Sequence, residues 1–124
     1  MKNVELRFAK ISYEEPIVYL VFKDGSHLEA DDIREIIKVS AELSDNKPYK
    51  LLSDARGFVQ ISSEARRISA DRDESPLIIA NAVLVNNLAV RITGNIFMSL
   101  NKPHFPIRLF DDKKKALKWL SNRG

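Results

Sequence analysis

The residues best suited to form a functional site lie in one stretch, Lys50–Arg66, with the sequence KLLSDARGFVQISSEAR. A short apolar run there ends in an acid, a glycine turn follows, and two serines open a helical pattern. In α/β folds this combination lies where strand ends and helix starts present polar groups to a ligand or partner. The candidate residues are Asp54, Arg56, Gly57, Ser62 and Ser63.

Two interpretations of this stretch remain open. The functional one is a partner-facing polar site at a helix amino terminus, where a phosphoryl group on Ser62 or Ser63 would lie against free amide groups. Glu64 would repel that phosphate. The structural one is an Asp54–Arg56 ion pair across a turn, two capping serines, and a glycine that lets the chain turn toward the helix.

Catalytic and metal-binding patterns are missing from the sequence. His27 and His104 lack a metal-ligand spacing or a neighbouring nucleophile, and there is no cysteine. The acidic pairs at 31–32 and 111–112 each open an amphipathic helical pattern, which predicts helix caps. We therefore expect a protein that is not an enzyme and has no metal site and no cofactor.

Hydrophobic periodicity predicts the elements that position the candidate site. Strands are expected at 3–12, 17–22, 49–53, 77–85 and 107–110, with a short extended piece at 27–29. Helices are expected at about 31–43, 62–72, 87–101 and 112–120. The fold class is α/β: a mixed, mostly parallel sheet of about five strands, with an amino-terminal antiparallel hairpin and helices packed around the sheet.

The third predicted helix is apolar around much of its circumference. Leu88, Ile92, Ile96 and Leu100 form one row, and a second side carries Val90, Gly94, Phe97 and Met98. One sheet face cannot cover both sides of such a helix. The second side is therefore expected to contact a second copy of the chain, a neighbouring helix, or an apolar ligand.

Length and composition restrict the class of protein. A chain of 124 residues predicts one domain over 1–124. The net charge of +3, with scattered lysines and arginines, argues against a nucleic-acid partner. The amino terminus lacks the apolar core of a signal peptide, and no apolar run is long enough to span a membrane, so a cytoplasmic protein is expected.

The order of elements and the stretch from Asp54 to Ser63 resemble the STAS domain, the fold of anti-anti-sigma factors. In that family an aspartate closes the third strand and a glycine follows three residues later, as Asp54 and Gly57 do here. Ser63 falls at the family's phosphorylatable serine, and Ser62 replaces the aspartate before it. The carboxyl-terminal half is similar to small uncharacterised bacterial proteins described as STAS-like or Sec14-like, and this resemblance implies binding without chemistry.

Two functions follow as hypotheses. The first is a regulatory or protein-interaction module, homodimeric through the third helix and switched at the serine that opens the second helix. The second is a carrier or sensor for a small apolar or lipid-like molecule, held between the third helix and the sheet. The first predicts a filled core, whereas the second requires a cavity lined by Val90, Phe97 and Met98.

Overall fold

The computed structural model describes residues 2–57, 59–86 and 103–123. Its main sheet has six strands in the order β1-β2-β3-β5-β7-β8. The bounds are β1 Lys2–Glu5, β2 Ala9–Glu14, β3 Ile17–Phe22, β5 Tyr49–Asp54, β7 Ile78–Leu84 and β8 Ile107–Phe110. The pairs β1/β2 and β2/β3 are antiparallel, and β3/β5, β5/β7 and β7/β8 are parallel. The predicted α/β class with a mostly parallel sheet is confirmed.

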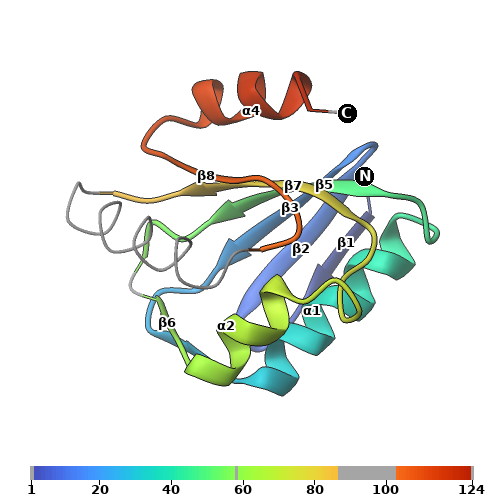
Figure 1. The fold of residues 1–124 in the computed structure, drawn as a ribbon. Helices are drawn as coiled ribbons and strands as arrows, with labels where there is room; N and C mark the ends of the chain where they lie inside the picture. The colour runs from blue at the N-terminus through green and yellow to red at the C-terminus, as the bar shows by residue number, and fades with distance from the viewer. Residues whose placement is uncertain (1, 58, 87–102, 124) are drawn as a thin grey trace.

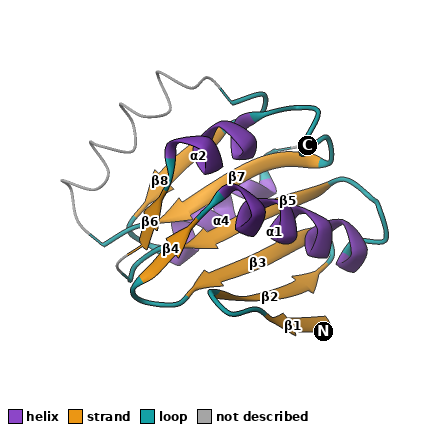
Figure 2. Ribbon diagram, turned by 90° about the horizontal axis from the view of Figure 1, so that it is seen from below, coloured by secondary structure: helices purple, strands orange, loops and turns teal. Residues whose placement is uncertain are grey.

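Helices lie on both sides of this sheet. Helices α1 (Ala30–Leu43) and α2 (Ser63–Ala70) cover one face, and α4 (Lys113–Ser121) lies on the opposite face (Figure 1). Figure 2 shows α1 and α2 in front of the strands and α4 behind them. Because side chains alternate between the faces of a strand, each sheet face has its own hydrophobic core.

The two cores differ in composition. Large aliphatic and aromatic residues form the core on the α1/α2 side, among them Ile11, Leu20, Ile36 and Leu51. The α4 side is built around buried alanines and leucines: Leu52, Ala80, Ala82, Leu84, Ala116 and Leu120.

The strand expected at 3–12 was wrong in its extent. The chain forms two strands there, because it turns at residues 6–8, where the Leu6 amide donates to the Ala9 carbonyl at 2.7 Å. β2 alone pairs with β3, from Ala9↔Phe22 to Glu14↔Ile17, and β1 extends the sheet beyond it. The alternation that suggested one continuous strand spans both pieces.

A second, two-stranded parallel sheet joins β4 (Ser26–Leu28) to β6 (Val59–Ile61). The short extended piece expected near His27 corresponds to β4, but β6 was not predicted. Three residues give too short a pattern to separate a strand from a loop, so only the pairing partner reveals this one.

The helix starts correct one prediction and confirm another. Glu29, and not Asp31 or Asp32, is the N-cap of α1, and Asp32 accepts a hydrogen bond from the Glu29 amide at 2.8 Å, which forms a capping box. Asp112 caps α4, accepting from the Lys114 amide at 2.8 Å, as one of the two predicted alternatives. The second helix ends at Ala70, two residues before its predicted end. The helix predicted over 87–101 lies outside the described residues.

Candidate functional site

The first half of the predicted site is an ion pair between Asp54 and Arg56 at the end of β5. The Arg56 Nη2 and Nε groups donate to the Asp54 carboxylate at 2.7 and 3.0 Å, and the Arg56 amide donates to the same carboxylate at 3.1 Å. Hydrogen bonds from Arg56, opposed by partial burial, hold the pKa of Asp54 below its usual value. The Asp54–Arg56 pair thus matches the structural interpretation.

The loop after this pair is held by close contacts. Asn86 Nδ2 donates to the Arg56 carbonyl. A Cβ on Gly57 would come within 3.1 Å of the Asp24 Cα atom, so this glycine permits close approach of two backbone segments. The left-handed backbone conformation occurs at Gly25, with φ 83°, and not at Gly57.

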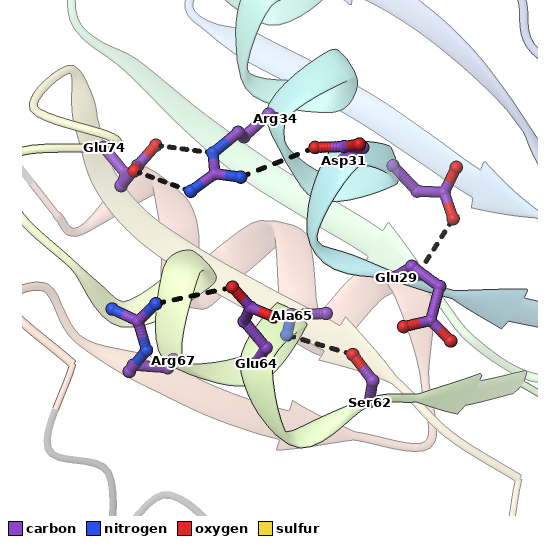
Figure 3. A network of polar contacts seen from close by, with 9 residues as sticks. Glu29, Asp31, Arg34, Ser62, Glu64, Ala65, Arg67 and Glu74 are labelled. Carbon is purple, nitrogen blue, oxygen red and sulfur yellow. Dashed lines mark hydrogen bonds and ion pairs between the residues drawn. The ribbon is translucent and has the colours of Figure 1, made fainter.

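The second half of the predicted site is the start of α2. Ser62 is the N-cap, and its Oγ accepts from the Ala65 amide at 3.1 Å (Figure 3). Ser63 is exposed, and its Oγ accepts a hydrogen bond from Arg66 Nη2 at 3.2 Å. The two serines therefore differ: one stabilises the helix, and the other presents its hydroxyl to solvent.

The two halves of the predicted site follow different strands, one at the end of β5 and the other after β6. Asp54 lies in the main sheet opposite Val21 and Leu84, whereas the Ser62 amide bonds to the Leu28 carbonyl at the edge of the small sheet. Within the described ranges, no hydrogen bond or ion pair joins Asp54, Arg56 or Gly57 to Ser62 or Ser63. Strand β6 lies between the two groups in the chain, and their acting as one site stays a prediction.

A pocket of about 550 Å³ lies beside these residues, on the α1/α2 face of the sheet. Most of its described lining is aliphatic or aromatic, supplied by the sheet, by α1 and by the β4/β6 pair. Representative lining residues are Leu20, Leu28, Ile36, Leu51, Val59 and Ile107. Small-molecule sites typically have volumes of about 300–1,000 Å³ and mostly apolar walls, so this pocket has the size and chemistry of a ligand site.

Four polar side chains also line the pocket: Ser53, Arg66, Ser69 and Asn81. Ser53 Oγ donates to Asn81 Oδ1 at 2.8 Å across the β5/β7 pair. Ser69 Oγ donates to the Arg66 carbonyl at 2.8 Å within α2. A few polar groups within apolar walls are the usual means of orienting a bound molecule.

Sequence reasoning did not find this pocket. The available signals were Asn81, a polar residue inside the apolar run Leu77–Val85, and Ser53 at the end of a buried strand. Neither has a recognisable spacing, because the two residues are brought together by the pairing of β5 with β7. The apolar residues predicted to line a cavity or form a dimer surface, Val90, Gly94, Phe97 and Met98, lie outside the described residues.

The histidines occupy separate places. His27 Nε2 lies 2.8 Å from Glu29 Oε1 in the small sheet, and His104 Nε2 lies 3.4 Å from Ser75 Oγ. In the part of the chain that the structure describes, no group of three or more potential metal-ligating side chains occurs. No helix within the described ranges is long and apolar enough to cross a membrane.

An ion-pair frame connects α1 with the loop after α2. Arg34 on α1 contacts Asp31 at 3.5 Å and Glu74 at 3.3 Å, and Figure 3 shows its guanidinium between the two carboxylates. On α2, Glu64 pairs with Arg67 at 3.8 Å on the exposed side. The Arg34–Glu74 contact links α1, which lines the pocket, to the loop after α2, whereas the Glu64–Arg67 pair lies within α2.

Comparison with solved structures identifies a similar fold. The crystal structure of an uncharacterized protein of the DUF3478 family from Shewanella loihica PV-4, which has a SpoIIAA-like fold, superimposes with a TM-score of 0.62 at 17% sequence identity. The match covers 90% of this chain and 91% of that one. The expected STAS-like fold is therefore confirmed.

Comparisons of sequence place the chain in a family. No curated protein matches it significantly. Residues 11–123 match the family described as Domain of unknown function (DUF7793), which covers nearly the whole chain. The chain therefore belongs to the DUF7793 family.

Proposed function

We propose that this protein is a carrier or sensor that binds a small, mostly apolar molecule in the pocket on the α1/α2 face. The observation that supports the proposal is the pocket itself, about 550 Å³ with largely aliphatic walls and four polar side chains. Burying an apolar ligand there would be favourable by about 25 cal/mol for each Å² of apolar surface removed from water.

Binding without chemistry is part of the proposal. The described lining contains no carboxylate, imidazole or thiol. Its hydroxyls are bonded to an amide oxygen at Ser53 and to a backbone carbonyl at Ser69, neither of which is a general base. A hydrolytic or group-transfer enzyme that uses a side-chain nucleophile requires a base in contact with it. The described lining contains no such nucleophile–base pair.

A volume-filling variant tests the proposal. Val83 lines the pocket from β7, so Val83→Phe should reduce binding of the uncharged fluorescent dye Nile red while leaving the free energy of unfolding nearly unchanged. Val21→Phe is the matched control, because Val21 is 46% exposed and does not line the pocket. Native mass spectrometry of protein from its own host should reveal a small apolar adduct.

A loss of stability in Val83→Phe would contradict the proposal. If Val83→Phe lowers the free energy of unfolding by about 1–3 kcal/mol, as overpacking of a filled core does, the space is not available to a ligand. Absence of dye binding to the unmodified protein would likewise reject the proposal.

A second candidate function is a regulatory module that binds a partner protein and is switched at Ser63. It is supported by the exposed Ser63 hydroxyl at the start of α2 and by Arg66 Nη2 at 3.2 Å from it. A phosphoryl group there would meet a guanidinium and free helix amides. In this candidate the protein works in the cytoplasm as a homodimer.

Intact-mass measurement of protein from host cells tests the switch. A fraction carrying one phosphate should be present and should disappear in Ser63→Ala, whereas the capping Ser62 is not expected to be modified. Unphosphorylated protein under all growth conditions would argue against this candidate and leave the carrier proposal unaffected.

A further inference from the structure

Two side chains of the pocket lining, Asn81 and Arg66, can donate hydrogen bonds to a ligand. Asn81 Oδ1 already accepts from Ser53 Oγ at 2.8 Å, so the polar atom that Asn81 has left to offer is its amide nitrogen. That nitrogen, which carries two N–H groups, makes no hydrogen bond to any other described residue. The Ser69 hydroxyl hydrogen is directed to the Arg66 carbonyl at 2.8 Å, so this hydroxyl, like that of Ser53, can only accept from a ligand. A ligand oxygen that accepts hydrogen bonds would complement Asn81.

The described lining of the pocket carries a positive charge and no negative one. Arg66 is the single charged residue in the described lining, which contains no carboxylate. Its Nη2 donates to Ser63 Oγ at 3.2 Å, which leaves the other guanidinium nitrogens to be tested as ligand donors. A positive charge at a largely apolar pocket favours an anion, because the low local dielectric strengthens their attraction.

We propose, resting on the binding function above, that the ligand is an amphiphile with an apolar body and one anionic oxygen group of the carboxylate type. The apolar body occupies the space beside Ile36, Leu51 and Ile107. The oxygens of the anionic group accept hydrogen bonds from the Asn81 amide and the Arg66 guanidinium. Charge-assisted hydrogen bonds of this kind give orientation as well as affinity.

Decanoate and decanamide form the probe pair, since they share a hydrocarbon chain and differ in charge. Their affinities are to be compared by isothermal titration at pH 8, where a carboxylate is ionised. We expect decanoate to bind about tenfold more tightly, the change in affinity that one charge-assisted hydrogen bond supplies.

Four substitutions at three positions test which residues cause the preference for decanoate. Arg66→Gln should remove most of the tenfold ratio, whereas Arg66→Lys should retain part of it. Arg67→Gln makes the same charge change one residue away, outside the described lining, and should leave the ratio intact. Asn81→Asp keeps an acceptor for Ser53 but adds a negative charge, so it should weaken decanoate more than decanamide.

The outcomes separate the two proposals. Equal binding of both probes, or a ratio that survives both Arg66→Gln and Asn81→Asp, overturns the anionic ligand and leaves the apolar carrier standing. Failure of both probes and of Nile red to bind overturns the carrier as well. Circular dichroism of each variant establishes whether it is folded. If Arg66→Gln does not fold, the ratio of probe affinities is compared between Arg66→Lys and the unmodified protein.

Discussion

The two faces of the sheet are packed differently. On the α4 face, Ala80, Ala82, Ala116 and Leu120 are fully buried, and small side chains on β7 and α4 allow the helix to lie close to the strands. On the α1/α2 face, larger branched side chains enclose a pocket of about 550 Å³. Small side chains therefore pack closely on the α4 face, whereas the α1/α2 face encloses the pocket in which the proposed ligand would bind.

A polar contact also holds α4 against the sheet on the closely packed α4 face, called the closed face below. Lys50 on β5 donates from Nζ to the Leu120 carbonyl at 2.8 Å, at the carboxyl end of α4. A cation at that end satisfies a terminal carbonyl and complements the helix dipole. On the α1/α2 face, the ion pair between Arg34 and Glu74 joins α1 to the loop after α2. Neither residue lines the pocket.

Truncating a leucine on each face should give the largest difference. Leu120→Ala removes a fully buried side chain from the closed face and should lower the free energy of unfolding by about 2–5 kcal/mol. Leu109→Ala removes a half-buried side chain that already borders the pocket, so its cost should stay below about 1.5 kcal/mol. Urea denaturation measures both, and equal losses would contradict the proposed difference between the faces.

Adding volume should produce the opposite contrast along one strand. Ala82 and Val83 are neighbours on β7 that point to opposite faces. Ala82→Phe should destabilise the protein by about 1–3 kcal/mol, because α4 leaves no room for the ring. Val83→Phe should be nearly neutral, and thermal unfolding of the two variants gives the comparison directly.

The serines at the start of α2 should separate a structural role from an exposed one. Ser62→Ala removes the N-cap acceptor of the Ala65 amide and should cost about 1 kcal/mol in unfolding free energy. Ser63→Ala should cost less than about 0.5 kcal/mol, since its hydroxyl is exposed. A larger loss from Ser63→Ala would mean that the Ser63–Arg66 contact helps to hold α2 in place.

A small effect that depends on pH is expected at the Asp54–Arg56 pair. The pKa of the Asp54 carboxyl in the folded protein lies below the unfolded value of 3.8. The stabilisation from the pair is therefore present at neutral pH and is lost as pH falls through the folded-state pKa. Because the Arg56 side chain is 49% exposed, Arg56→Gln should cost less than about 1 kcal/mol at pH 7. Urea titrations at pH 7 and about pH 2 should show this difference disappearing, and Asp54→Asn as a background should abolish it at both pH values.

The parts of the candidate site that could be predicted from sequence are those formed by residues close together in the chain. The capping role of Ser62 and the Asp54–Arg56 pair were among the predicted alternatives, because both depend on residues within a few positions of each other. Their union into one site stays a prediction: β6, which pairs with β4, lies between the two groups in the chain, and no hydrogen bond or ion pair joins them among the described residues. Strand pairing over long sequence separations has no local signature.

The sequence by itself determined the α/β class, most of the helices and strands within the described residues, and the caps at Ser62 and Asp112. It could do so because periodicity and capping are local properties of the chain. The tertiary structure alone decided the split of the first strand, the β4/β6 pair, and the meeting of Ser53, Asn81 and Arg66 around a pocket. Those features depend on which distant segments lie side by side, and so on the packing of the whole sheet with its helices.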